Sequence, residues 1–148
     1  MSHIHEDIWI EAPIEVVYGL FCDPSRNPRL SVEDVAVSNI SGPMDQVGTT
    51  FDSTVRLPGI ELTQRSLVTE VEPFRLIRVV DAEGDDVIYR FEPEGAGTRF
   101  SIDVEHAPAG AFGKIPLRVV VDGAIDRGLR RMDDRLKAMA EAEVPEPV

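Results

Sequence analysis

The order of hydrophobic periodicities constrains the fold of this chain more than any other feature. A run of period two comes first, then a short helical stretch, then repeated alternating runs from Val32 to His106, and last a helical stretch from Gly113 to Ala142. Alternating runs joined by short turns form an antiparallel meander, and its apolar face has to be covered. The last helix is long enough to cover it.

The first thirty residues predict one strand and two short helices. Ile4, Ile8 and Ile10 all lie at even-numbered positions, and this period-two pattern indicates a half-buried strand over residues 4–10. Pro13 suits the first turn of a helix, which the apolar spacing extends to Phe21. An Asp-Pro pair at 23–24 ends this helix, and a second short helix follows through Leu30.

Turn residues divide the middle of the chain into six further strands. These are expected over residues 32–41, 48–57, 60–72, 75–82, 86–92 and 97–106. The sequence thus predicts an α+β fold in which a seven-stranded antiparallel sheet wraps around the long C-terminal helix. We expect a single domain over residues 1–143 and a frayed tail at 144–148. Because a strongly twisted sheet does not pack flush on one helix, a cavity is expected between them.

Charge and cysteine content narrow the functions open to the chain. Its 148 residues include 27 acidic and 15 basic side chains, for a net charge of −12. This charge repels nucleic-acid phosphates and anionic lipids, so neither is an expected partner. Cys22 is the one cysteine, and the N-terminus has no basic and apolar leader, which together predict a cytoplasmic protein. No membrane span, cofactor or metal site is expected.

Four segments and the closing helix occur in an order typical of one superfamily. The segments are Ile8–Val17 (IWIEAPIEVV), the Asp-Pro pair at 23–24, Val68–Leu76 (VTEVEPFRL) and Gly97–Phe100 (GTRF). In this order they resemble the START/birch-pollen-allergen superfamily (SRPBCC), and within it the bacterial polyketide cyclase/dehydrase and lipid-transport group. The resemblance covers nearly the whole chain and implies the helix-grip fold.

The resemblance also implies a function without fixing the chemistry, because this fold hosts carriers, receptors and enzymes. We expect the cavity to bind a small hydrophobic or polyketide-like molecule, as a carrier or as a cyclase/dehydrase-type enzyme. The alternative is a protein-interaction domain that uses the cavity mouth or a sheet edge without a small ligand. The sequence is also compatible with a homodimer. A large pocket with inward polar groups favours an enzyme, a large dry one a carrier, and a collapsed one a partner protein.

Two departures from the family pattern count against an aromatase. Family members often carry tryptophans after the Asp-Pro helix, at the cavity mouth, where this chain has residues 27–30 (NPRL). Aromatase/cyclase members resemble one another in an arginine on a central strand, and Val68 aligns with it here. No catalytic motif is diagnostic, so the sequence leaves open whether the protein is an enzyme.

Two apolar faces of different period predict which residues bind the ligand. They are Phe51, Val55, Phe100, Ile102 and Val104 from the sheet, and Val121, Ile125, Leu129 and Met132 from the helix. The resemblance to the family adds Val68, Arg78, Tyr89 and Phe91 to the expected ligand-binding residues.

Arg78 and Tyr89 are candidates for the polar end of this cavity. The family pattern points Arg78 inward, diagonal to Tyr89 on the next strand, where a guanidinium and a phenol would hold a carboxylate or polarise a carbonyl. In the opposite strand phase, Ile77 and Val79 face inward and Arg78 faces solvent. We favour the second phase and keep Arg78 as a candidate.

The three histidines are expected to approach one another, because in the helix-grip fold that the resemblance implies the first strand pairs antiparallel with the last. By parity, His106 shares the inner face with Glu6, and the two are candidates for an acid/base pair. His3, His5 and Glu105 share the outer face, where a weak zinc site is a less favoured interpretation than plain surface.

Gly123 and Gly128 interrupt the last helix at a cost of about 1 kcal/mol each relative to alanine. Either a ligand needs the space, or the helix packs closely on the sheet there. Asp122 and Asp126 are interpreted as a solvated acidic edge rather than a catalytic pair.

Overall fold

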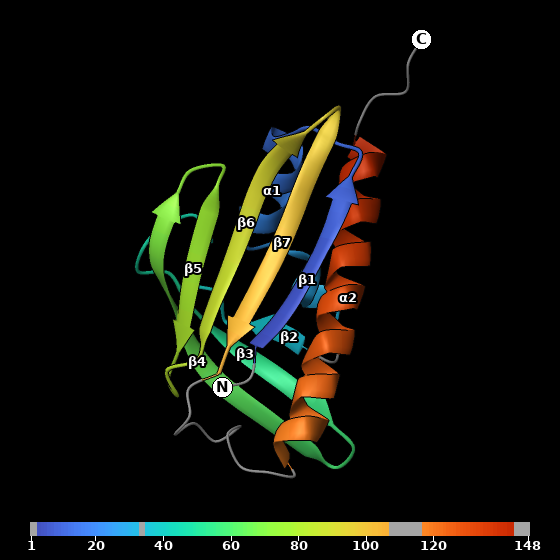
Figure 1. The fold of residues 1–148 in the computed structure, drawn as a ribbon. Coiled ribbons are helices and arrows are strands. Elements are labelled where there is room, and N and C mark those ends of the chain that lie inside the picture. The colour runs from blue at the N-terminus through green and yellow to red at the C-terminus, as the bar shows by residue number, and fades with distance from the viewer. Residues whose placement is uncertain (1–2, 33–34, 107–116, 144–148) are drawn as a thin grey trace.

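The computed structural model describes residues 3–32, 35–106 and 117–143, without the side chains of residues 31 and 117–121 (Figure 1). Its elements are β1 (His3–Ile10), α1 (Ile14–Cys22), the 3₁₀ helix η1 (Pro28–Ser31), β2 (Val35–Ser38), β3 (Thr50–Leu57), β4 (Ile60–Glu72), β5 (Leu76–Asp81), β6 (Asp86–Glu94), β7 (Gly97–Glu105) and α2 (Leu117–Glu143).

The strands form one antiparallel sheet in the order β1-β7-β6-β5-β4-β3-β2. The sheet curls, and α2 runs along it beside β1, while α1 lies behind β6 and β7 in Figure 1. The predicted α+β helix-grip fold, with its seven-stranded sheet, long last helix and two short helices after β1, is therefore confirmed. No described helix is long and apolar enough to cross a membrane.

Most strand boundaries agree with the pattern, and β2 differs most. It covers Val35–Ser38 instead of residues 32–41, because η1 extends to Ser31 and the pairing with β3 ends at Ser38; residues 33–34 lie outside the described part of the chain. β4 agrees from Ile60 to Glu72 because turn residues bracket it on both sides. The predicted helix start at Gly113 and the predicted tail at 144–148 lie outside the described residues.

Local hydrogen bonds fix the turn that carries η1. The Asn27 side chain accepts from the backbone N–H of Arg29 (2.9 Å) and donates to the carbonyl of Phe21 (2.8 Å). Pro28 occupies the first helical position, where its missing N–H costs nothing. The turn therefore holds Arg29 in one place at the side of the sheet.

Aromatic rings fill the inner face of the sheet next to α1. The ring centroid of Phe21 lies 4.7 Å from Tyr89, 5.5 Å from Phe91 and 5.7 Å from Phe100. All four side chains are buried. Because interiors are close-packed, this cluster leaves no room for a ligand at the α1 end of the sheet.

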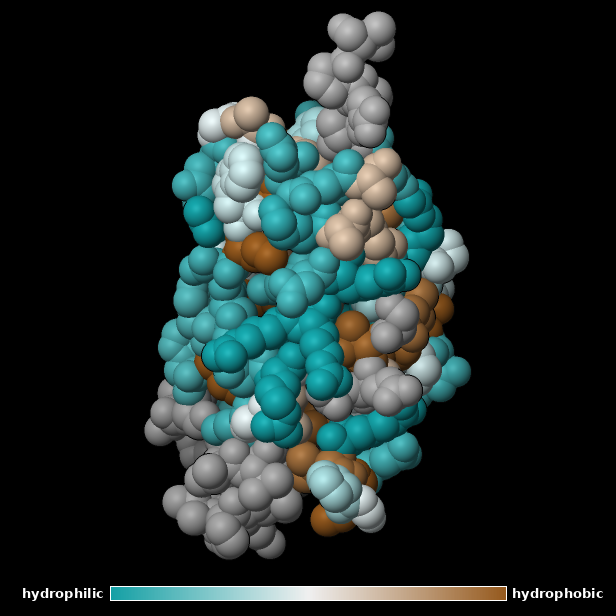
Figure 2. Space-filling model, turned by 90° about the vertical axis from the view of Figure 1, so that its right-hand side faces the viewer, coloured by the Kyte–Doolittle hydropathy of each residue, from teal (hydrophilic) through white to brown (hydrophobic). Residues whose placement is uncertain are grey.

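Polar contacts join α2 to β1 and the bend after it. Arg130 Nε donates to Glu6 Oε1 (3.0 Å), Lys137 Nζ to the carbonyl of Trp9 (3.1 Å), and the backbone N–H of Glu11 to Glu141 Oε2 (2.9 Å). Figure 2 shows that this side of the molecule is largely hydrophilic, with hydrophobic patches between. The long helix is thus held by charge along one side and by apolar packing on its inner face.

The two helix glycines have different surroundings. A Cβ on Gly128 would lie 2.5 Å from a methyl carbon of Val35, whereas one on Gly123 would meet only the Arg127 guanidinium at 3.5 Å. Close packing of α2 on β2 therefore explains Gly128, and Gly123 lies in ordinary contact.

Gly97→Ala is expected to destabilise the fold by about 1–3 kcal/mol, as overpacking does. A Cβ at this position would lie 2.3 Å from the carbonyl oxygen of Ile10 and 2.7 Å from the Trp9 ring. The Ile10 oxygen belongs to backbone that the β1–β7 pairing holds in place, so it cannot easily move. Urea unfolding measures the loss.

Gly19→Ala is the matched control for Gly97→Ala. Gly19 lies in α1, and an added Cβ there meets nothing within 4 Å. Alanine is the better helix former, so this variant should gain up to about 1 kcal/mol. A Gly97→Ala protein as stable as wild type would contradict the expected clash.

Candidate functional site

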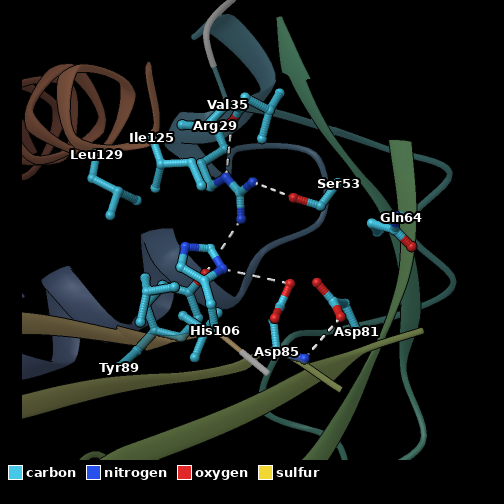
Figure 3. A pocket seen from close by; sticks show the side chains of 13 residues that line it. Arg29, Val35, Ser53, Gln64, Asp81, Asp85, Tyr89, His106, Ile125 and Leu129 are labelled. Carbon is cyan, nitrogen blue, oxygen red and sulfur yellow. Dashed lines mark hydrogen bonds and ion pairs between the residues drawn. The ribbon is translucent and has the colours of Figure 1, made fainter. Parts of the chain in front are cut away.

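An internal cavity of about 70 Å³ lies between the sheet, η1 and α2 (Figure 3). It is lined by Arg29, Val35, Ser53, Val55, Gln64, Asp81, Asp85, Val87, Tyr89, Val104, His106, Ile125 and Leu129. Ordinary small-molecule pockets measure roughly 300–1,000 Å³, so this cavity is small. Its wall combines polar and charged groups with aliphatic side chains.

Arg29 is the buried cation of the cavity, with 7 % of its surface exposed. Its Nε donates to the carbonyl of Val35 (2.9 Å), one Nη to Ser53 Oγ (2.6 Å) and the other to the Tyr89 hydroxyl (3.3 Å). These three partners are neutral. None of the carboxylates that the structure describes forms an ion pair with the Arg29 guanidinium.

A pair of acids lies across the cavity, at the turn between β5 and β6. Asp81 Oδ1 accepts from the backbone N–H of Glu83 (2.9 Å) and of Asp85 (3.0 Å), and Asp85 is 2 % exposed. Burial, and then the charge of Asp85, raise the pKa of Asp81 to about 6. Asp81 can therefore take up or release a proton near neutral pH.

His106 lies between Arg29 and Asp85 in Figure 3 and is almost fully buried. Its Nδ1 lies 3.6 Å from Asp85 Oδ2, and its Nε2 lies 3.0 Å from Asp122 Oδ1 on α2. The two carboxylates fix the orientation of the His106 ring. The cavity thus combines an acid–base group with the hydrogen-bond donors of Arg29 and Tyr89.

The structure places some of the predicted ligand-binding residues on the cavity and packs others into the core. Those that line the cavity are Val55, Tyr89, Val104, Ile125 and Leu129. Those buried in the core instead are Phe51, Val68, Phe91, Phe100, Ile102 and Met132. The aromatic cluster around Phe21 occupies the space that they were expected to border. The side chain of Val121 lies outside the described residues.

Arg78 lies on the outer face of the sheet, away from the cavity. Its Nε donates to Asp86 Oδ1 (2.9 Å) and one Nη to Asp86 Oδ2 (2.6 Å), while Ile77 and Val79 are buried on the inner face. In the β5–β6 register, Ile77 and not Arg78 shares a face with Tyr89. The expectation that Arg78 and Tyr89 meet in the cavity is wrong, and the alternative strand phase is correct.

The predicted histidine clusters are only partly formed. Glu6 lies against α2 and contacts Arg130, so it does not pair with His106. On the outer face, His3 Nε2 and His5 Nδ1 both contact Asp103 Oδ1, at 2.9 and 2.7 Å. Among the described residues, no three His, Cys, Asp or Glu side chains are placed to hold a metal ion.

Asp122 and Asp126 of α2 differ from the expected solvated edge. Asp122 contacts the buried His106, as described above. Asp126 pairs with Arg130 at 2.9 Å. Asp122 therefore belongs to the site, whereas Asp126 belongs to the polar contact between α2 and β1.

Sequence reasoning missed the residues that make the cavity polar. These are Arg29, Ser53, Gln64, Asp81 and Asp85. One signal for Arg29 was available, because it occupies the stretch where the family often carries tryptophans at the cavity mouth. Asp81 and Asp85 flank the Glu83-Gly84 turn, and aspartates are common turn residues, so nothing in the sequence indicated that these two line the cavity.

Comparisons with known proteins place the chain among a defined group. A family model described as "Polyketide cyclase / dehydrase and lipid transport" matches residues 1–137. A search of curated proteins finds no match.

Solved structures of the same fold cover nearly the whole chain. TTHA0849 from Thermus thermophilus is 19% identical, with 97% of this chain and 100% of that chain covered and a TM-score of 0.73. Ms6760 from Mycobacterium smegmatis is 16% identical, with 96% and 92% covered and a TM-score of 0.72. BH1534 from Bacillus halodurans is 19% identical, with 95% and 97% covered and a TM-score of 0.68. At these identities the likeness is one of fold.

Proposed function

Because the chain belongs to the polyketide cyclase/dehydrase and lipid transport family, we propose that it binds a small, largely apolar molecule whose carbonyl or carboxylate oxygen lies at Arg29. The observation that carries this proposal is the buried Arg29 guanidinium, whose three hydrogen-bond acceptors are all neutral oxygens. A buried charge without a counter-ion is costly, and an anionic or strongly polarised oxygen would offset that cost.

The rest of the wall supports a ligand with an apolar body. Val55, Val104, Ile125 and Leu129 line the cavity together with the polar groups. A volume of about 70 Å³ admits only a few non-hydrogen atoms. A polyketide-sized or lipid-sized ligand therefore requires this aliphatic wall to move apart when it binds.

The acid–base groups favour a cyclase/dehydrase-type enzyme over a carrier. A carrier needs only shape and one anchoring group, whereas this wall also holds His106 within 3.6 Å of Asp85. In our proposal Arg29 and Tyr89 hold the ligand oxygen, and His106 moves a proton on a neighbouring atom. Arg78 and Glu6, which lie away from the cavity, take no part.

Arg29→Gln should weaken binding of ligands that carry an acceptor oxygen by roughly ten- to a hundredfold. The lost charge-assisted hydrogen bonds are worth about 1.5–3 kcal/mol. Calorimetry with a ten-carbon carboxylate, the matching methyl ketone and the matching alkane measures this selectivity, since the alkane makes no polar contact.

Arg78→Gln is the matched control, because it removes an arginine from the outer face. It should leave all three affinities within about twofold of wild type. An equal loss for the alkane and the carboxylate in Arg29→Gln would show that Arg29 only supports the fold.

Native mass spectrometry of protein purified from its own source tests for a co-purifying ligand. If one is found, returning it to the apo protein separates the two functions. Chemical change that His106→Gln abolishes supports the enzyme, and recovery of unchanged ligand supports the carrier. Purification with no ligand, together with no binding in the calorimetric series, would favour the protein-interaction alternative, which the small cavity also suits.

A further inference from the structure

A second hollow, of about 500 Å³, lies against α1 on the surface and shares no lining residue with the cavity. Its walls come from α1 and the two residues after it, from residues 43–45, and from Phe74 in the turn between β4 and β5. We call it the α1 groove. Nothing in the cavity chemistry above explains it.

Aromatic rings form the apolar part of the α1 groove. The Tyr18 and Phe74 ring centroids lie 4.7 Å apart with a 40° tilt. Phe74 is 45 % exposed and has a φ of 61°, a backbone conformation that is strained for a bulky side chain. Such strain persists where the surroundings hold it and is concentrated at functional positions. Here it presents an aromatic face to solvent.

The rim of the groove is acidic. Glu15, Asp23 and Asp45 line it, and none of the three forms an ion pair with a Lys or Arg among the described residues. On the groove floor, burial and then the charge of Asp45 raise the pKa of Cys22. The groove therefore carries an acidic rim on a chain whose net charge is already −12.

The groove wall also carries a phenol oxygen. Tyr18 is 4 % exposed, and its hydroxyl lies against the backbone of Phe74 and the side chain of Cys22. A phenol oxygen can both donate and accept hydrogen bonds, so this wall offers an acceptor beside the aromatic faces.

We propose that the α1 groove binds a basic segment of a partner protein, with an arginine side chain stacked on Phe74 and directed towards Tyr18 and Asp45. Guanidinium groups stack on aromatic faces and donate in several directions, which suits an aromatic wall beside carboxylate and hydroxyl oxygens. Arginine is also among the residues that dominate interface energetics.

The spacing of the carboxylates favours a peptide over a small amine. Glu15 and Asp23 are eight positions apart along α1, about 12 Å at 1.5 Å per residue. One cation cannot contact both. Two basic side chains four residues apart on an extended segment span about 13 Å, which matches.

The test uses a fluorescent, acetylated and amidated peptide of sequence Arg-Ala-Leu-Ala-Arg, titrated with the full chain and followed by anisotropy. Phe74→Asn keeps a residue that tolerates positive φ, so the fold should survive. It should weaken binding roughly five- to thirtyfold through the lost stacking. Glu15→Gln with Asp45→Asn should weaken binding about tenfold and reduce its salt dependence.

Two controls complete the experiment. Asp134→Asn removes an exposed acid from α2, far along the chain from the groove, and should bind within about twofold of wild type. The peptide Glu-Ala-Leu-Ala-Glu should not bind. Three results would overturn the proposal: no binding of the arginine peptide at millimolar concentration, equal binding by the groove variants, or equal affinity for free agmatine, which would indicate a small-cation site instead.

Discussion

Asp133→Asn is expected to raise the free energy of unfolding by roughly 2–4 kcal/mol at pH 7 and to change it little at pH 4. Asp133 lies on the inner side of α2 and is 3 % exposed, and its Oδ1 has no hydrogen-bond partner among the described residues. Burial first, and then the charges of Glu6, Asp134 and Asp7, raise its pKa to about 8.

The direction of the pH dependence follows from the two pKa values of Asp133. In the unfolded chain its carboxyl has a pKa near 3.9. Below about pH 4 the carboxyl group is protonated in both the folded and the unfolded state, so it does not lower the stability of the fold. Between about pH 4 and pH 8 only the unfolded state ionises, so stability falls by about 1.4 kcal/mol per pH unit. Asparagine cannot ionise and removes this loss.

Urea unfolding at pH 4, 5.5, 7 and 8.5 measures the Asp133 effect. Asp134→Asn is the matched control, because the neighbouring carboxylate is exposed and should change stability by less than about 0.5 kcal/mol. A difference between wild type and Asp133→Asn that is the same at every pH would mean that Asp133 is ionised in the folded protein.

Leu129→Ala should destabilise the fold by about 2–5 kcal/mol and enlarge the cavity. Leu129 is 3 % exposed and forms part of the aliphatic cavity wall beside Ile125. Losing three buried carbon atoms removes packing contacts, and because one side already borders empty space, the loss should fall in the lower part of this range. The larger cavity should bind branched ligands better than wild type does.

Leu30→Ala provides the control for Leu129→Ala, because Leu30 is 44 % exposed and should contribute within about 0.5 kcal/mol. Thermal melts with and without a branched ketone separate the two consequences. Equal stability of Leu129→Ala and Leu30→Ala would mean that α2 does not present Leu129 to the interior.

The fold could be predicted because each element has a local signal. Pro58-Gly59 and Pro73 bracket β4, and its predicted range of 60–72 agrees with the structure. The strand phase of β5 could not be predicted in the same way. Both parities of this strand are rich in apolar residues, so alternation does not distinguish Ile77 and Val79 from the parity that holds Arg78.

The charged members of the cavity wall could not be predicted because they belong to turns and strand ends. Arg29 lies in the short helix η1, Asp85 precedes β6, and His106 follows β7. Charged residues in such positions are usually exposed, so their burial depends on how distant segments come together. His106 could be placed on the inner face because the resemblance to the family implied the pairing of β1 with β7, which the structure contains.

The contact between α2 and β1 has a consequence for aggregation. β1 and β2 are the two end strands of the sheet. Open end strands recruit strands from other chains, because their free backbone groups act as templates. On β1, Lys137 already donates to the carbonyl of Trp9, and α2 lies alongside (Figure 1). β2 is only four residues long. In the described part of the chain, neither end strand offers a long open row for strand-by-strand growth into fibres.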